Sequence, residues 1–128
     1  MLRPLQPVIK ALLQEEPGEL VVPAPVTAEV DHLLGRRLGR VARLPFLDDL
    51  AAGRFTVECL DADDHGVVAD LEPRYDDLHV GLADLSLVVI AKRFGTRRLL
   101  TFDERHFRAL RPLDGGTFSL LPADAPKR

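Results

Sequence analysis

The sequence has a single cysteine, Cys59, which excludes an internal disulfide and any zinc site built on several cysteines. We expect this residue in the core. No apolar run reaches the roughly 18–20 residues that a membrane-spanning helix needs, and residues 1–14 lack the continuous apolar segment of a secretory signal. The chain also lacks an excess of positive charge: 17 basic residues against 20 acidic ones give a net charge of −3. These absences indicate a cytoplasmic protein that would contact nucleic acid only through local basic patches.

What the chain does contain is enough for one domain with its own core, since 46% of its 128 residues are hydrophobic. Strand-like and helix-like segments alternate and are joined by short loops. This order is typical of an α/β domain with a mostly parallel central sheet flanked by helices. We expect that domain to span residues 1–122 and a polar tail to occupy residues 123–128.

Turn residues and hydrophobic periodicity set the limits of the expected elements. We expect residues 23–25 to form a loop, Pro45 to stand in the first turn of a short helix, and Asp61 to cap the helix that follows it. The expected strands are 20–22, 55–60, 98–102 and 118–121, and the expected helices are 5–16, 26–38, 45–52, 62–71, 82–94 and 104–110.

The most informative stretch runs from Gly81 to Phe107 and reads GLADLSLVVIAKRFGTRRLLTFDERHF. Its first half is so apolar that we expect a helix covered by other elements on most sides. Gly95 suits the left-handed position that ends a helix. Residues 98–102 have the length and polarity of a buried strand. Asp103 follows at the carboxyl end of that strand, where open α/β sheets bind their ligands.

Three acidic residues, Glu29, Asp84 and Asp103, occupy positions that allow them to converge. Glu29 follows the strand at 20–22, Asp103 ends the strand at 98–102, and Asp84 begins the helix between them. Clustered carboxylates repel one another unless they share a hard cation such as Mg²⁺ or Mn²⁺. Such an ion can activate water for attack on a phosphodiester. Each acid also has a structural alternative, which is the helix dipole for Glu29 and helix capping for Asp84 and Asp103.

The other charged residues fit solvent-exposed surfaces. Four arginines, Arg36, Arg37, Arg40 and Arg43, form a basic cluster that we interpret as a solvated helix end, with contact to an RNA backbone as the alternative. The acids that we interpret as solvated are Asp31, Asp48, Asp49, Asp63 and Asp64.

The sequence resembles the PIN-domain family, and within it the VapC-type toxins of bacterial toxin–antitoxin systems. The matching segments are LVVPAPVTAEVDHLLGRRLG, then YDDLHVGLADLSLVVIAKRFGTRRLLTFDERHFRALRP, and the short strand FSLLP. The resemblance covers nearly everything from residue 20 to residue 122. It implies a Mg²⁺- or Mn²⁺-dependent endoribonuclease whose catalytic and metal-binding acids are Glu29, Asp84 and Asp103. It also implies a VapB-like antitoxin as inhibitor, and a homodimer.

Further residues take expected roles from the same resemblance. Thr101 matches the hydroxyl residue that stands two positions before the last acid of the family and helps to order the site. We expect Arg97, Arg98 and Arg105, which lie near that acid in the sequence, to position the phosphate backbone.

One part of the family pattern has no counterpart in this sequence. PIN domains begin with a strand that ends in a metal-binding Asp, and this chain has no Asp before Asp31. We expect the opening strand to be absent, through a start site assigned too late, a truncated gene or an altered clone. The coherent pattern after Leu20 favours the first explanation. The alternative function is a catalytically inactive remnant that only binds an antitoxin or a partner subunit.

Overall fold

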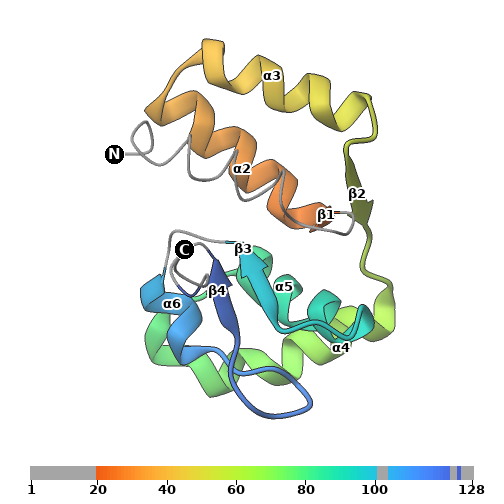
Figure 1. Ribbon diagram of the computed structural model, residues 1–128. Coiled ribbons are helices and arrows are strands. Elements are labelled where there is room, and N and C mark those ends of the chain that lie inside the picture. Colours follow the sequence, from red (N-terminus) through yellow and green to blue (C-terminus); the bar gives the residue numbers. More distant parts are fainter. Residues whose placement is uncertain (1–19, 101–103, 122–123, 125–128) are drawn as a thin grey trace.

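The computed structural model describes residues 20–100, 104–121 and 124 (Figure 1). The predicted helix over residues 5–16 lies outside these residues. In chain order the elements are β1 (Leu20–Pro23), α2 (Ala24–Arg37), α3 (Arg40–Ala51), β2 (Phe55–Glu58), α4 (Ala62–Leu71), the 3₁₀ helix η2 (Glu72–Leu78), α5 (Leu82–Arg93), β3 (Arg98–Leu100), α6 (Glu104–Ala109) and β4 (Ser119–Leu121).

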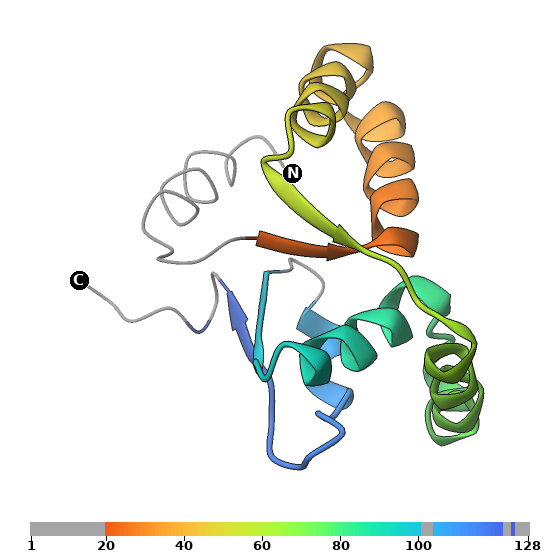
Figure 2. The ribbon, with the colours of Figure 1, turned by 90° about the vertical axis from the view of Figure 1, so that its right-hand side faces the viewer.

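The four strands form two parallel pairs, which agrees with the predicted parallel pairing of an α/β fold. β1 pairs with β2, with Leu20 opposite Phe55, and β3 pairs with β4, with Arg98 opposite Ser119. No hydrogen bonds between strands join the two pairs within the described residues. Each pair is connected by helices, as parallel neighbours require. Figures 1 and 2 show α2 and α3 beside the first pair and α5 and α6 beside the second.

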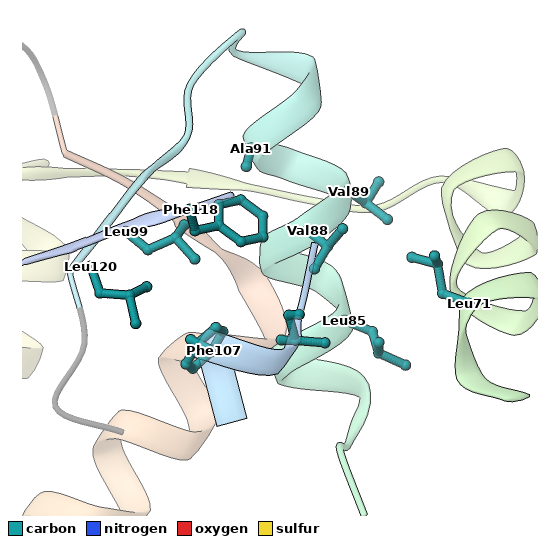
Figure 3. Close-up of a cluster of buried hydrophobic side chains, with 10 residues drawn as sticks. Leu71, Leu85, Val88, Val89, Ala91, Leu99, Phe107, Phe118 and Leu120 are labelled. Atoms are coloured by element: carbon teal, nitrogen blue, oxygen red, sulfur yellow. The ribbon is translucent and has the colours of Figure 1, made fainter. Parts of the chain in front are cut away.

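The core is organised around α5, as the apolar stretch at 82–94 predicts. Side chains from α4, β3, α6 and β4 surround this helix (Figure 3). Leu82 and Phe94, at its two ends, are partly exposed, so the helix is covered only along its middle. Gly95 has a φ of 62°, the left-handed conformation expected after the last turn. The buried apolar cluster consists of Leu71, Leu85, Val88, Val89, Ala91, Leu99, Phe107, Leu110, Phe118 and Leu120.

Two helices begin earlier than the sequence predicts. α2 starts at Ala24, inside the expected loop, because Pro25 then stands in the first turn, where its missing N–H needs no partner. α3 starts at Arg40 and contains Pro45 in its interior rather than in its first turn. Gly39 explains this early start, since its φ of 81° lets the chain leave α2 and enter α3 within two residues.

The predicted cap of α4 is confirmed, and it forms a reciprocal pair. The Asp64 N–H donates to the Asp61 carboxylate over 2.8 Å, and the Asp61 N–H donates to the Asp64 carboxylate over 3.0 Å. This is a capping box, which satisfies two backbone donors at the start of the helix.

Cys59 is exposed, so the expectation that it lies in the core is wrong. It belongs to the connection between β2 and α4, and such connections run over the surface. Arg93, the last residue of α5, holds this connection in place. Its guanidinium donates to the Cys59 carbonyl over 3.1 Å and forms an ion pair with Asp64.

One residue of the predicted tail, Asp124, is bound to α6. The Arg108 guanidinium donates to both oxygens of its carboxylate, over 2.6 and 2.7 Å. The Leu120 N–H donates to the same carboxylate over 2.7 Å. The Arg108 hydrogen bonds, followed by the one from Leu120, lower the pKa of Asp124 to about 2. Asp124 therefore connects α6 to β4.

Candidate metal site

Glu29 lies in the second turn of α2, and its side chain is exposed to solvent. The first turn of this helix contains no acidic residue. Because the helix dipole acts mainly within the first turn, it gives little reason for a carboxylate at this position. The structural alternative for Glu29 is therefore weaker than the sequence suggests, and the residue is accessible to a ligand.

Asp84 lies in the first turn of α5 and is half-buried. The N-cap of this helix is Gly81, which has no side chain to bond the backbone, so Asp84 is not the N-cap residue. Placement in the first turn is favourable for a carboxylate. The helix dipole therefore offsets part of the cost of keeping the charged Asp84 carboxylate beside the apolar core.

The fold packs the two helices that carry these acids against each other. α2 contacts α5, and α5 also contacts β1, the strand that leads into α2. Asp103 and Thr101 lie outside the described residues. Within the described residues, no three His, Cys, Asp or Glu side chains form a group that could hold a metal ion. The assignment of Glu29, Asp84 and Asp103 as one site therefore stays a prediction.

The chemistry of the two described acids fits a hard divalent cation. Carboxylate oxygens are the ligands that Mg²⁺ and Ca²⁺ prefer, and Mg²⁺ commonly uses only one or two carboxylates together with water and substrate oxygens. Glu29 is exposed and Asp84 is half-buried, so neither carboxylate is closed off from solvent.

Three of the acids interpreted as solvated are instead engaged in the fold. Asp31 is half-buried and pairs with Arg43 at 2.5 Å, and Asp49 pairs with Arg54 at 2.5 Å. Asp64 forms the capping box and pairs with Arg93. The Asp61 N–H, aided by the Arg93 guanidinium, lowers the pKa of Asp64 against the opposing effect of partial burial.

A sequence signal existed for Asp64 but not for the other two acids. The spacing of two acids three residues apart before an apolar run is that of a capping box. Asp31 pairs with Arg43 on the next helix, and Asp49 pairs with Arg54 just beyond the end of α3, so both pairs depend on how the chain turns after each helix. Of the three arginines expected near the site, Arg97 is exposed, and its guanidinium lies 3.4 Å from the Asp114 carboxylate.

Comparison with known proteins agrees with the resemblance read from the sequence. The PIN domain family matches residues 3–111. Ribonuclease VapC26 of Mycobacterium tuberculosis is 42% identical over 103 residues, which are 80% of this chain and 76% of that protein. The crystal structure of Mycobacterium tuberculosis VapC20, described as a toxin that cleaves the sarcin-ricin loop, superposes with a TM-score of 0.65. That match has 20% identity and covers 73% of this chain and 72% of VapC20, so it supports the fold alone.

One further observation concerns membranes. Among the described residues, no helix has the length and apolar character needed to cross a bilayer.

Proposed function

Because the chain belongs to the PIN-domain family and, within it, to the VapC-type ribonuclease toxins, we propose that it hydrolyses RNA phosphodiesters with a divalent cation, Mg²⁺ or Mn²⁺. The observation that carries this proposal is the 42% identity to a ribonuclease over 80% of the chain. The packing of α2, which carries Glu29, against α5, which carries Asp84, supports it.

In this proposal Glu29, Asp84 and Asp103 hold the ion. When bound, such an ion lowers the pKa of water and stabilises the negative charge that develops on the phosphate. The exposed Glu29 contributes the carboxylate on the substrate side. The half-buried Asp84 is held by the first turn of a helix whose middle lies in the core, so its position is well fixed. Arg98 and Arg105, close to Asp103 in sequence, position the phosphate backbone.

The proposed partners are those of the toxin family. They are an RNA substrate, a VapB-like antitoxin that blocks the activity, and a second copy of the chain in a homodimer. Several large apolar side chains are exposed and are available for such contacts. Val41 on α3 has 87% of its surface exposed, and Leu82 on α5 has 46%. We place the protein in the cytoplasm, where RNA is found.

The central test compares RNA cleavage by the unmodified chain and by its Asp84→Asn variant in the presence of Mg²⁺. We expect the rate to fall at least about 100-fold, or about 2.7 kcal/mol of transition-state stabilisation. Calorimetric titration with Mn²⁺ should show weaker binding by the same variant. The matched control is Asp70→Asn, since Asp70 is an exposed acid on α4. Equal rates for the Asp84 and Asp70 variants would contradict the assignment.

The alternative function is an inactive remnant that only binds an antitoxin or a partner subunit. It predicts no RNA cleavage by a folded sample and no Mn²⁺ binding that depends on Asp84. Retained binding of an antitoxin under those conditions would favour this alternative.

A further inference from the structure

Three arginines at the junction of α2 and α3 differ from most arginines of the described chain in having no acidic partner there. We call Arg36, Arg37 and Arg40 the arginine corner. All three are exposed, and none forms an ion pair with an acid in the described residues. Elsewhere the described ion pairs join Arg43 to Asp31, Arg54 to Asp49, Arg93 to Asp64 and Glu58, Arg97 to Asp114, and Arg108 to Asp124.

Local helix energetics explain only part of the arginine corner. Arg36 and Arg37 lie in the last turn of α2, where the helix dipole favours positive charge. Arg40 is the first residue of α3, where the dipole disfavours it, and the first turn of α3 has no acid to compensate. A charge that is both unpaired and locally unfavourable points to an interaction with something outside the chain.

The arginine corner is held rigidly by the backbone and by a neighbouring ion pair. The Leu38 and Gly39 N–H groups both donate to the Leu34 carbonyl, over 2.9 and 3.0 Å. Arg43 pairs with Asp31, and a Cβ placed on Gly35 would lie 3.3 Å from the Arg43 side chain. Gly35 thus leaves room for Arg43 to cross α2. Because the backbone of the junction is already fixed, a ligand that binds there has only the arginine side chains to order.

The arginine corner is continuous with the face of α2 that carries Glu29. Glu29, His32 and Arg36 are spaced three and four residues apart, so they follow one another along the same side of the helix. All three are exposed. The seven residue steps from Glu29 to Arg36 span about 10.5 Å along the helix axis. A strand bound at Glu29 could therefore run along α2 to the corner.

We propose that the arginine corner binds RNA phosphates adjacent to the cleaved bond, with the strand lying along the exposed face of α2. This inference rests on the proposed ribonuclease function. Phosphate contacts by arginine position a nucleic acid without reading its sequence. On a protein with a net charge of −3, a local concentration of unpaired arginines supplies the attraction that the whole chain lacks.

The test measures binding of a short fluorescent single-stranded RNA in EDTA, so that the result does not depend on the metal. The variant Arg36→Gln/Arg37→Gln/Arg40→Gln is compared with the unmodified chain over a series of salt concentrations. Each phosphate contact on a single strand contributes about 0.7 to the slope of log affinity against log salt. We expect the slope of the triple variant to be smaller by about 2, and that of Arg40→Gln alone by about 0.7.

The matched control is Arg54→Gln/Arg74→Gln/Lys92→Gln, which removes the same charge from exposed positions outside the arginine corner. Its slope should stay close to that of the unmodified chain. Equal slopes for the two triple variants would overturn the proposal. It would also be overturned if the corner variant kept normal RNA binding but lost binding of a polyglutamate peptide, since the corner would then be a protein-docking surface. A different outcome is that the unmodified chain binds RNA through the arginine corner but does not cleave it. That outcome would count against the ribonuclease function and not against the corner.

Discussion

Helix α5 and the α2–α3 hairpin, residues 24–51, differ in how many of their residues are buried. α5 buries six of its residues, Leu85, Ser86, Val88, Val89, Ile90 and Ala91, whereas α2 and α3 contain no buried residue. Figure 1 shows the hairpin beside β1–β2, and α5 among the other helices and β3. The comparison teaches that the core is built on the α5 region, while the hairpin leaves charged and apolar side chains exposed to solvent.

The largest expected effect comes from truncating one leucine in each region. Leu85→Ala should lower the free energy of unfolding by about 2–5 kcal/mol, because the residue is 1% exposed and the lost side chain leaves a cavity. Leu44→Ala in α3 removes the same atoms from a side chain that is 37% exposed, and should cost less than about 1 kcal/mol. Urea denaturation of both variants measures the difference. Similar losses would mean that the hairpin belongs to the core.

A smaller loss of stability is expected from removing the capping box of α4. The helices of the hairpin, α2 and α3, have no such side-chain cap. Asp61→Ala should destabilise the protein by about 1 kcal/mol, because the Asp64 N–H loses its acceptor. Thermal unfolding followed by circular dichroism measures this loss. Asp63→Ala is the control, since it removes a neighbouring acid that lies outside the capping box. If the two variants unfold at the same temperature, the hydrogen bonds of the capping box add no stability beyond that of an acidic residue at the start of the helix.

Two substitutions in the arginine corner should change the free energy of unfolding in opposite directions. Arg40→Gln removes a positive charge from the start of α3 and should raise the stability by about 0.3–1 kcal/mol at low salt. Arg37→Gln removes one from the end of α2 and should lower it by a similar amount. Urea denaturation at low and high salt tests both, and the difference should shrink as salt screens the dipoles. Two variants that are both less stable would show that Arg40 has a structural partner.

The smallest effect concerns the acid dependence of the Arg108–Asp124 pair. The pKa of Asp124 is lowered to about 2 from the ordinary value of 3.8. A lowered pKa in the folded state stabilises the protein above about pH 4, and this contribution is lost as the pH falls toward 2. The Asp124→Asn variant should lack this component, so its stability should approach that of the unmodified chain as the pH falls. Urea midpoints at about pH 5 and about pH 2.5 measure it, and a constant gap between the two proteins would contradict the role of the pair.

For the candidate site, sequence reasoning depended on local signals. It identified Glu29 and Asp84, and the fold carries them on two helices that pack together. Their assignment with Asp103 to one metal site stays a prediction. Sequence reasoning was wrong about Asp31, because its partner Arg43 comes from the next helix and depends on the turn at Gly39. It was also wrong about Cys59, because β2 ends at Glu58, before the expected strand end at residue 60, and Cys59 therefore lies in an exposed connection.

The sequence by itself determined the apolar α5, the glycine that follows it, the cap at Asp61 and membership of the PIN-domain family. These features depend on periodicity, on backbone conformations that glycine adopts easily, and on residues only a few positions apart. Only the tertiary structure decided which strands pair, how Arg93 and Arg108 connect distant segments, and which arginines remain without a described acidic partner. Those outcomes depend on contacts between residues far apart in the chain, which no local pattern encodes.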